Sequence, residues 1–115
     1  MGGAVDASSD ESEIELDRFE LVLLLRPDAR PTVSEEESDR LQELHVAHLA
    51  ALTRAGSIRV AGPFDEQRDQ TLRGLAIYQT GSLERTRHLA ESDPAVVAGR
   101  LAVDVMYFYC PKGQL

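Results

Sequence analysis

Two histidines one helical turn apart are the residues of this chain whose type and spacing could do chemistry. His45 and His48 stand at positions where a helical pattern calls for leucines. Imidazole is polar and changes its charge near neutral pH, so it serves as a general acid or base, a metal ligand or a hydrogen-bonded core residue. The pair therefore raises two hypotheses, a chemical site and a satisfied buried hydrogen bond.

The helical periodicity turns both histidines toward the core. At roughly 100° per residue, His48 falls at the centre of the apolar face that includes Leu41 and Leu52. His45 falls just beside the centre of that face, and charged residues take the opposite side. Both imidazoles are expected to point toward the rest of the fold rather than into solvent.

Around this helix the pattern predicts six elements in the order βαββαβ. Ser34 and Glu37 form a capping-box pattern at the start of the first helix, and Gly56 is the predicted left-handed residue at its end. Gly62-Pro63 is expected to halt the second strand. The elements are strands over 18–25, 58–61, 72–80 and 100–109, a helix from the Ser34 cap to 55, a helix from the Ser82 cap to 91, and a helical turn after Asp93-Pro94.

This order predicts an α+β fold of the ferredoxin-like type, with a four-stranded antiparallel sheet and both helices on one face. The strands carry apolar residues enough for both faces of the sheet, and an uncovered apolar face requires a partner. We therefore predict a homodimer whose sheets pack face to face. The apolar residues that the strands place there or under the helices include Phe19, Leu75, Tyr78, Leu101, Val105 and Tyr107.

Length and charge limit the partners. A chain of 115 residues suits one core. Residues 1–17 carry six acidic side chains and no Lys or Arg, so of the net charge of −8 only −2 belongs to residues 18–115. The first segment is predicted to be a disordered acidic tail. A nucleic-acid partner is disfavoured, because the tail would repel phosphates and no basic stripe attracts them.

Membrane association and secretion are not expected either. The longest apolar run has the length of a strand rather than the roughly 20 residues of a membrane span. The first residues lack the basic and apolar regions of a secretory signal. The single cysteine, Cys110, suits a reducing compartment, so a cytoplasmic location is predicted.

Several motifs in combination identify a family resemblance. They are His45-x-x-His48-Leu49-x-x-Leu52-x-x-x-Gly56, Ala61-Gly62-Pro63-Phe64, Arg73-Gly74 and Ala90-Glu91-x-Asp93-Pro94-Ala95-Val96-x-Ala98-Gly99. With these motifs, residues 18–113 resemble the YciI-like (YCII-related) family of small bacterial proteins. The resemblance implies a ferredoxin-like, dimeric α+β-barrel domain with a pocket that holds a histidine and an aspartate.

The resemblance also implies which residues serve that pocket. The family's helix histidine falls on His45 and its aspartate falls on Asp93, with His48 as a supporting substrate contact. Gly62-Pro63 would place a tight turn at the pocket mouth, where amide groups could meet an anionic oxygen. Two plainer interpretations stay open, since Asp before Pro is a common helix cap and Gly-Pro a common strand stop.

The chemistry that these residues imply is general acid–base catalysis without a cofactor or metal. A carboxylate orients the histidine and stabilises its imidazolium. A metal is disfavoured because helical metal sites more often space their histidines by four residues. By resemblance the reaction is that of a lyase, isomerase or hydrolase acting on a small ring compound. The alternative is a non-catalytic dimer that binds a small ligand or acts as an accessory domain.

Overall fold

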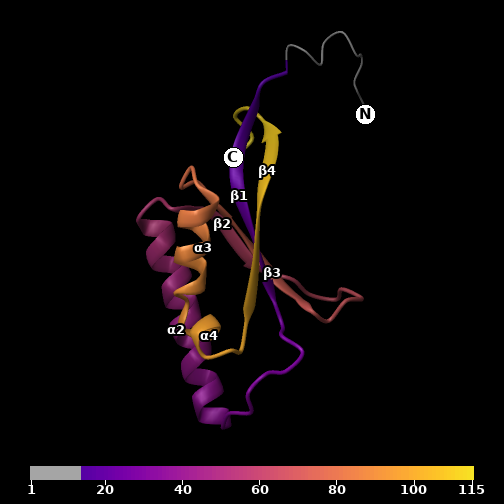
Figure 1. Ribbon diagram of the computed structural model, residues 1–115, viewed down its shortest axis with the longest axis vertical. Helices are drawn as coiled ribbons and strands as arrows, with labels where there is room; N and C mark the ends of the chain where they lie inside the picture. The colour runs from indigo at the N-terminus through magenta and orange to yellow at the C-terminus, as the bar shows by residue number, and fades with distance from the viewer. Residues whose placement is uncertain (1–13) are drawn as a thin grey trace.

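Four strands and two longer helices follow one another in the predicted order, with a short third helix before the last strand (Figure 1). The computed structural model describes residues 14–115. The elements are β1 (Leu16–Leu25), α2 (Glu35–Arg54), β2 (Ile58–Pro63), β3 (Leu72–Tyr78), α3 (Leu83–Glu91), α4 (Pro94–Val97) and β4 (Ala102–Pro111).

The predicted acidic tail lies mostly outside the described residues. Its last two residues, Leu16 and Asp17, form the start of β1, because they pair with Pro111 and Cys110 of β4. The strand thus begins two residues before the sequence pattern indicates. Residues 1–13 of the proposed tail lie outside the described part of the chain.

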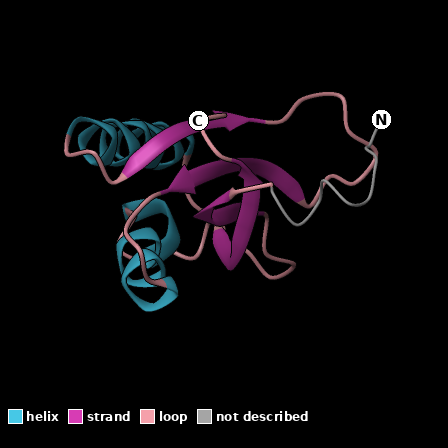
Figure 2. Ribbon diagram, turned by 90° about the horizontal axis from the view of Figure 1, so that it is seen from above, coloured by secondary structure: helices cyan, strands magenta, loops and turns pink. Residues whose placement is uncertain are grey.

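The sheet has the strand order β2-β3-β1-β4, and every neighbouring pair is antiparallel. This arrangement confirms the predicted ferredoxin-like topology. At the centre of the sheet Val22 of β1 lies opposite Ala76 of β3 on one side and Val105 of β4 on the other. Figure 2 shows the two longer helices gathered beside the strands.

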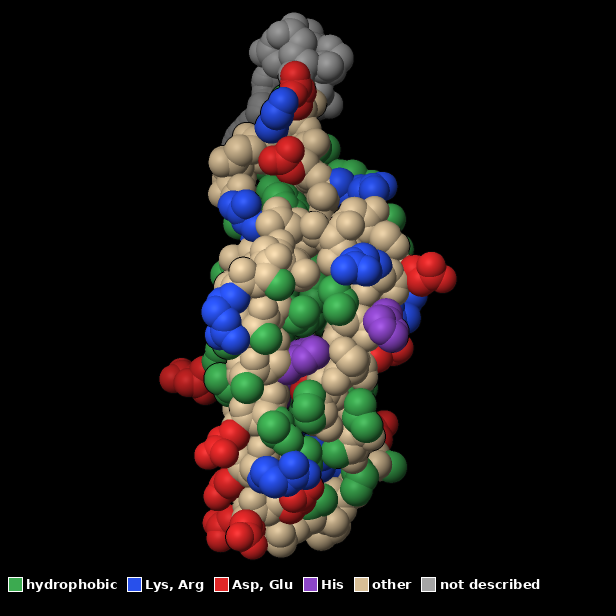
Figure 3. All heavy atoms as spheres, turned by 90° about the vertical axis from the view of Figure 1, so that its left-hand side faces the viewer, with side chains coloured by type: hydrophobic (Ala, Val, Ile, Leu, Met, Phe, Trp, Pro, Cys, Tyr) green, Lys and Arg blue, Asp and Glu red, His purple; other side chains and the backbone are tan. Residues whose placement is uncertain are grey.

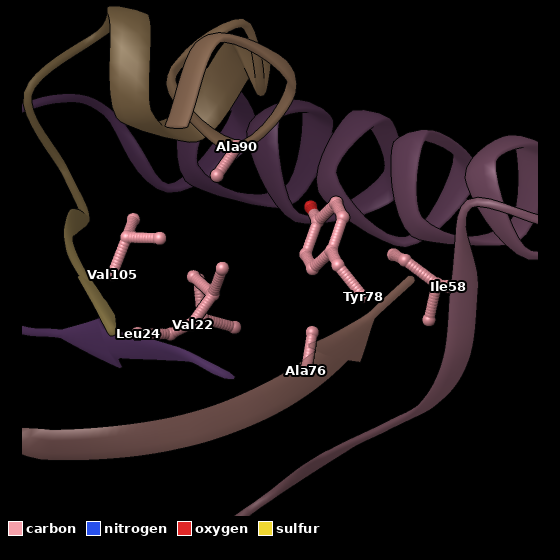
Figure 4. Close-up of a cluster of buried hydrophobic side chains, with 7 residues drawn as sticks. All are labelled: Val22, Leu24, Ile58, Ala76, Tyr78, Ala90 and Val105. Atoms are coloured by element: carbon pink, nitrogen blue, oxygen red, sulfur yellow. The ribbon is translucent and has the colours of Figure 1, made fainter. Parts of the chain in front are cut away.

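Both longer helices cover the same face of the sheet, as predicted. Side chains alternate between the two faces along a strand, so Val22, Ala76 and Val105 share a face. Ala90 of α3 and, from α2, Leu49 and Leu52 pack against this face. The core cluster that they cover comprises Val22, Leu24, Ile58, Ala76, Tyr78, Ala90 and Val105 (Figure 4).

The opposite face of the sheet carries a second apolar cluster. Phe19, Ile77 and Cys110 are buried there, with Leu21 and Leu75 packed against them. None of these five residues belongs to the cluster under the helices. Of the residues predicted for the two faces, Phe19 and Leu75 thus lie away from the helices, whereas Tyr78 and Val105 lie beneath them.

The start of α2 realises half of the predicted capping box. The backbone N–H of Glu37 donates to the Ser34 hydroxyl oxygen at 3.0 Å. The Glu37 carboxylate does not return to the cap but forms a two-pronged ion pair with Arg40, at 2.8 and 2.7 Å. At the other end, Gly56 has a φ of +84°, which confirms the predicted left-handed residue.

The prediction of a turn at Gly62-Pro63 is wrong, because β2 continues through both residues. Gly62 pairs with Leu75 and Pro63 with Gly74. Proline is tolerated here because β2 is an edge strand, where a missing N–H breaks no ladder. A Cβ on Gly74 would lie 2.6 Å from the Gly62 carbonyl oxygen, so only glycine permits this close strand pairing.

A buried carboxyl group ties the sheet to the start of α3. Glu20 of β1 is fully buried, with 0 % exposure. Its side chain accepts hydrogen bonds from the Thr80 N–H at 2.8 Å, the Gly81 N–H at 3.3 Å and the Thr86 hydroxyl at 2.8 Å. The burial of this polar group is therefore compensated by several donors.

Candidate functional site

His45 lies on the inner side of α2, where this helix packs against α4. Its exposure is 9 %, and Leu41, one turn earlier, is the other buried residue of α2. The helical periodicity thus correctly turned the His45 imidazole toward the fold. It wrongly placed His48, which is only partly buried, nearer the centre of that face. Figure 3 shows this side of the molecule, where hydrophobic side chains lie along the middle with one histidine among them and a second histidine nearer the edge.

Asp93 uses its two carboxylate oxygens for two different tasks. As the N-cap of α4, its Oδ1 accepts the Ala95 N–H at 2.9 Å, and Pro94 occupies the first turn of that helix. Its Oδ2 lies 2.5 Å from His45 Nδ1. The capping hydrogen bond thus fixes the position of the Asp93 carboxylate, while its second oxygen orients the imidazole of His45.

The electrostatics of the pair favour an ionised Asp93. Burial acts to raise the pKa of this carboxyl, whose exposure is 2 %, but the hydrogen bonds from His45 and the Ala95 N–H and the charges of His45 and His48 outweigh it and lower the pKa. Burial and the nearby Asp93 charge also raise the pKa of Tyr78 to about 12, so this phenol stays neutral near pH 7. With Asp93 accepting, Nδ1 carries the proton in the neutral imidazole.

Replacing Asp93 should remove a pH-dependent part of the stability. A carboxyl whose pKa is lower in the folded than in the unfolded state stabilises the fold above the unfolded pKa, and this contribution is lost as pH falls through the folded pKa. We expect Asp93→Asn, which keeps a capping oxygen, to lose about 2 kcal/mol near neutral pH. The deficit should shrink between about pH 5 and pH 2.

Thermal unfolding of the two proteins across this range measures the difference. Other carboxyl groups with lowered pKa values, such as Glu37 and Asp69, are common to both proteins and cancel. A stability difference that stays constant from neutral to acidic pH would contradict an ionised Asp93 paired with His45.

His45 Nε2 is the ring nitrogen left for a ligand. The one hydrogen bond of His45 among the described residues is that of Nδ1. In the described part of the chain, Arg30 Nε is the single buried side-chain nitrogen or oxygen that lacks a partner, so His45 Nε2 is not sealed from solvent. The imidazole itself lines a cavity. The Asp93 carboxylate thus contacts one side of the His45 ring, and the cavity lies on the other side.

The cavity has a volume of about 570 Å³, which suits a small organic molecule. One wall is the inner side of α2, and β2 and the ends of β1 and β3 supply others. Much of the lining is apolar, including Leu24, Leu41, Leu49, Val60, Ala95 and Leu101. Four arginines also line it, namely Arg26, Arg30, Arg73 and Arg100.

The YCII-related domain matches residues 21–108 of this chain. The chain belongs to the YCII-related domain family. The match runs from the second half of β1 to near the end of β4 and includes both His45 and Asp93. The expected family resemblance is therefore confirmed.

The chain is also similar to a solved enzyme structure. The 5-chloro-2-hydroxyhydroquinone dehydrochlorinase TftG from Burkholderia phenoliruptrix AC1100, solved in complex with 2,5-dihydroxybenzoquinone, is 25 % identical and has a TM-score of 0.45. The similarity covers 75 % of this chain and 90 % of that chain. No significant match was found among curated proteins.

Of the predicted site residues of this YCII-related domain, some line the cavity and others do not. Gly62 and Pro63 line the cavity with His45, although as part of a strand rather than a turn. His48 is absent from the cavity lining among the described residues, and its Nε2 lies 3.0 Å from the Leu89 carbonyl oxygen, which accepts its proton. His48 thereby links α2 to α3, and its contact with a substrate stays a prediction.

Sequence reasoning missed the four arginines of the cavity as a group. Arg73 was noted only as part of a family motif, and the others lie in segments without any motif. No local pattern could have found them, because strand pairing and loop paths bring them together.

Within residues 14–115 no three His, Cys, Asp or Glu side chains form a group that could hold a metal ion. In the same part of the chain, every helix is too short or too polar to cross a bilayer.

Proposed function

We propose that this YCII-related domain is a cofactor-free enzyme in which His45 and Asp93 perform general acid–base chemistry on a small molecule in the cavity. One observation carries the proposal: His45 bonds to a buried carboxylate through Nδ1 and lines the cavity with the same ring. This combination supplies both an oriented base and a place for its substrate.

In the proposed reaction, Nε2 of neutral His45 accepts a proton from the bound molecule. The electron pair of the broken bond stays on the substrate, and the imidazolium is stabilised by the Asp93 carboxylate. The same Nε2–H then returns its proton to another position or to a leaving group. Proton return elsewhere gives an isomerase, and loss of a leaving group gives a lyase. Proton transfer from a bound water gives a hydrolase.

The substrate class that we propose is a small ring compound, in keeping with the volume and the apolar lining of the cavity. A set of lactones, enol acids and halogenated phenols, incubated with the purified chain and followed by NMR, tests this. We expect conversion of at least one class, and its loss when His45 is replaced. Saturable binding of these compounds without conversion would favour the alternative of a non-catalytic ligand-binding domain.

We further propose that the chain forms a homodimer through the sheet face that lies away from the helices. This proposal is supported by Leu21 and Leu75 on that face, which pack against the buried Phe19, Ile77 and Cys110 and stay partly exposed themselves. Phe108, which pairs with Phe19, is 38 % exposed, so its ring is available to a second copy. Apolar surface of this kind is typically covered by a partner.

Sedimentation equilibrium tests the homodimer. We expect a dimer at micromolar concentration and a shift toward monomer for Phe108→Glu, which would place a charge in the interface. Tyr109→Glu is the matched control, because Tyr109 is the next residue of β4, points to the other face and is 53 % exposed. A monomeric parent chain at micromolar concentration would overturn the proposal.

A further inference from the structure

The cavity that holds His45 has a strongly one-sided charge. Its lining includes four of the twelve Lys and Arg residues of the chain and, among the described residues, no Asp or Glu. The arginines come from three segments: Arg26 and Arg30 lie in the connection between β1 and α2, Arg73 belongs to β3, and Arg100 precedes β4. This concentration of positive charge lies in a chain whose net charge is −8.

The Arg30 guanidinium lies close enough to the other three arginines of the cavity to be repelled by each of them. Burial lowers the pKa of Arg30 first, and the positive charges of Arg100, Arg26 and Arg73 lower it further. No carboxylate offsets this repulsion, since the salt bridges found among the described residues involve none of the four arginines. Like charges held together in this way are stabilised when an anion binds between them.

Arg30 also has an unused donor. Its Nε is buried and has no hydrogen-bond partner, and it is the one side-chain nitrogen or oxygen of this kind in residues 14–115. A buried donor without an acceptor is rare and indicates a missing partner. Guanidinium groups bind the two oxygens of a carboxylate or phosphate through paired N–H donors, and Nε supplies one donor of such a pair.

Arg100 is held in place by the neighbouring loop. One of its terminal nitrogens, Nη1, donates to the Pro31 carbonyl oxygen at 2.7 Å. This contact joins the segment before β4 to the loop that carries Arg30, and leaves the other donors of the Arg100 guanidinium unused by the protein among the described residues. A backbone carbonyl next to Arg30 in the sequence, rather than an acidic partner, thus holds the Arg100 side chain.

We propose that Arg26, Arg30, Arg73 and Arg100 form the anion subsite of the cavity, and that the substrate of the His45–Asp93 pair is a small organic anion. A carboxylate or phosphate group of the substrate binds the guanidinium groups, while the apolar part occupies the wall formed by Leu41 and Leu101 and presents its reacting proton to His45. This inference rests on the proposed function, because it specifies the substrate for the same cavity.

Isothermal titration with three probes of similar shape tests the subsite. Benzoate and phenyl phosphate carry the two anionic groups, and benzamide is the neutral counterpart. At low ionic strength we expect saturable binding of at least one anion, at least about tenfold tighter than benzamide. The tighter of the two anions identifies the carboxylate or the phosphate as the group recognised. Equal affinity for benzamide and both anions, or no saturable anion binding, would overturn the proposal.

Variants then assign the binding to the arginines. We expect Arg30→Lys, which keeps the charge but lacks Nε, and Arg73→Gln, at an exposed position, each to weaken anion binding by about tenfold. Arg87→Gln, at an exposed residue of α3 outside the cavity, is the matched control and should bind as the parent does. Unchanged anion affinity in both cavity variants would overturn the assignment.

His45→Asn separates the two proposals. This variant should lose conversion but still bind the anion more tightly than benzamide, because it leaves the arginines intact. Anion binding without any conversion by the parent would therefore refute the acid–base function alone. Conversion of neutral ring compounds, with no preference for anions, would refute the anion subsite alone.

Discussion

The His45→Asn variant is expected to fold as the parent chain does and to convert its substrate about 10²- to 10⁴-fold more slowly. The amide nitrogen of asparagine can occupy the place of Nδ1 and donate to Asp93, so the buried carboxylate keeps a partner. No group at the place of Nε2 can then accept a proton. Among the described residues the cavity lining contains no Asp or Glu that could replace this base.

Steady-state kinetics and thermal unfolding of the same preparation measure both parts of this prediction. His88→Asn is the matched control, because His88 is an exposed histidine of α3 that does not line the cavity. We expect this control to retain the activity of the parent. An unchanged kcat in His45→Asn would show that His45 does not transfer the proton.

Glu20→Ala is expected to be the most destabilising single truncation in the sheet, at about 3 kcal/mol or more. It removes the acceptor of the Thr80 and Gly81 N–H groups, which have no other hydrogen-bond partner among the described residues. It also removes the acceptor of the Thr80 and Thr86 hydroxyls, which can still bond to each other. Each unsatisfied donor costs about 1–3 kcal/mol. For a domain of this size the loss corresponds to a fall in Tm of more than about 10 °C.

Glu20→Gln is the control for this prediction, because its amide keeps one of the two oxygens. We expect a smaller loss, of about 1 kcal/mol, in chemical unfolding. Equal stability of the Ala and Gln variants would indicate that the hydrogen bonds to the Glu20 oxygens contribute little to the fold.

The features of the fold that depend on local sequence pattern were predicted correctly. The alternation around Val22, the Ser34 cap and the positive φ of Gly56 are local effects, and each was predicted. The errors concern pairing between distant segments. The start of β1 at Leu16 depends on β4, and the path of β2 through Pro63 depends on the position of β2 at the sheet edge.

In the candidate site, too, local features could be predicted from the sequence, and contacts between distant residues could not. Helical periodicity placed His45 on the inner face of α2, and the Asp-Pro pattern predicted the cap at Asp93. The contact between them joins residues 48 positions apart, and only the family resemblance indicated it. The arginine group had no such guide. Arg100 donates to the backbone carbonyl of Pro31, the residue after Arg30 and 69 positions away, and no side-chain pattern in the sequence predicts such a contact.

The short helix α4 has a consequence for how this protein tolerates change elsewhere. A helix of four residues has no stability of its own, so its conformation depends on the Asp93 cap and on packing against α2. Asp93 in turn aims the imidazole of His45. A substitution that loosens the packing around Ala95 therefore shifts the orientation of the His45 ring, which lies 50 positions away in the sequence. A mild substitution of this kind would slow the proposed reaction, and only a more disruptive one would also lower the melting temperature.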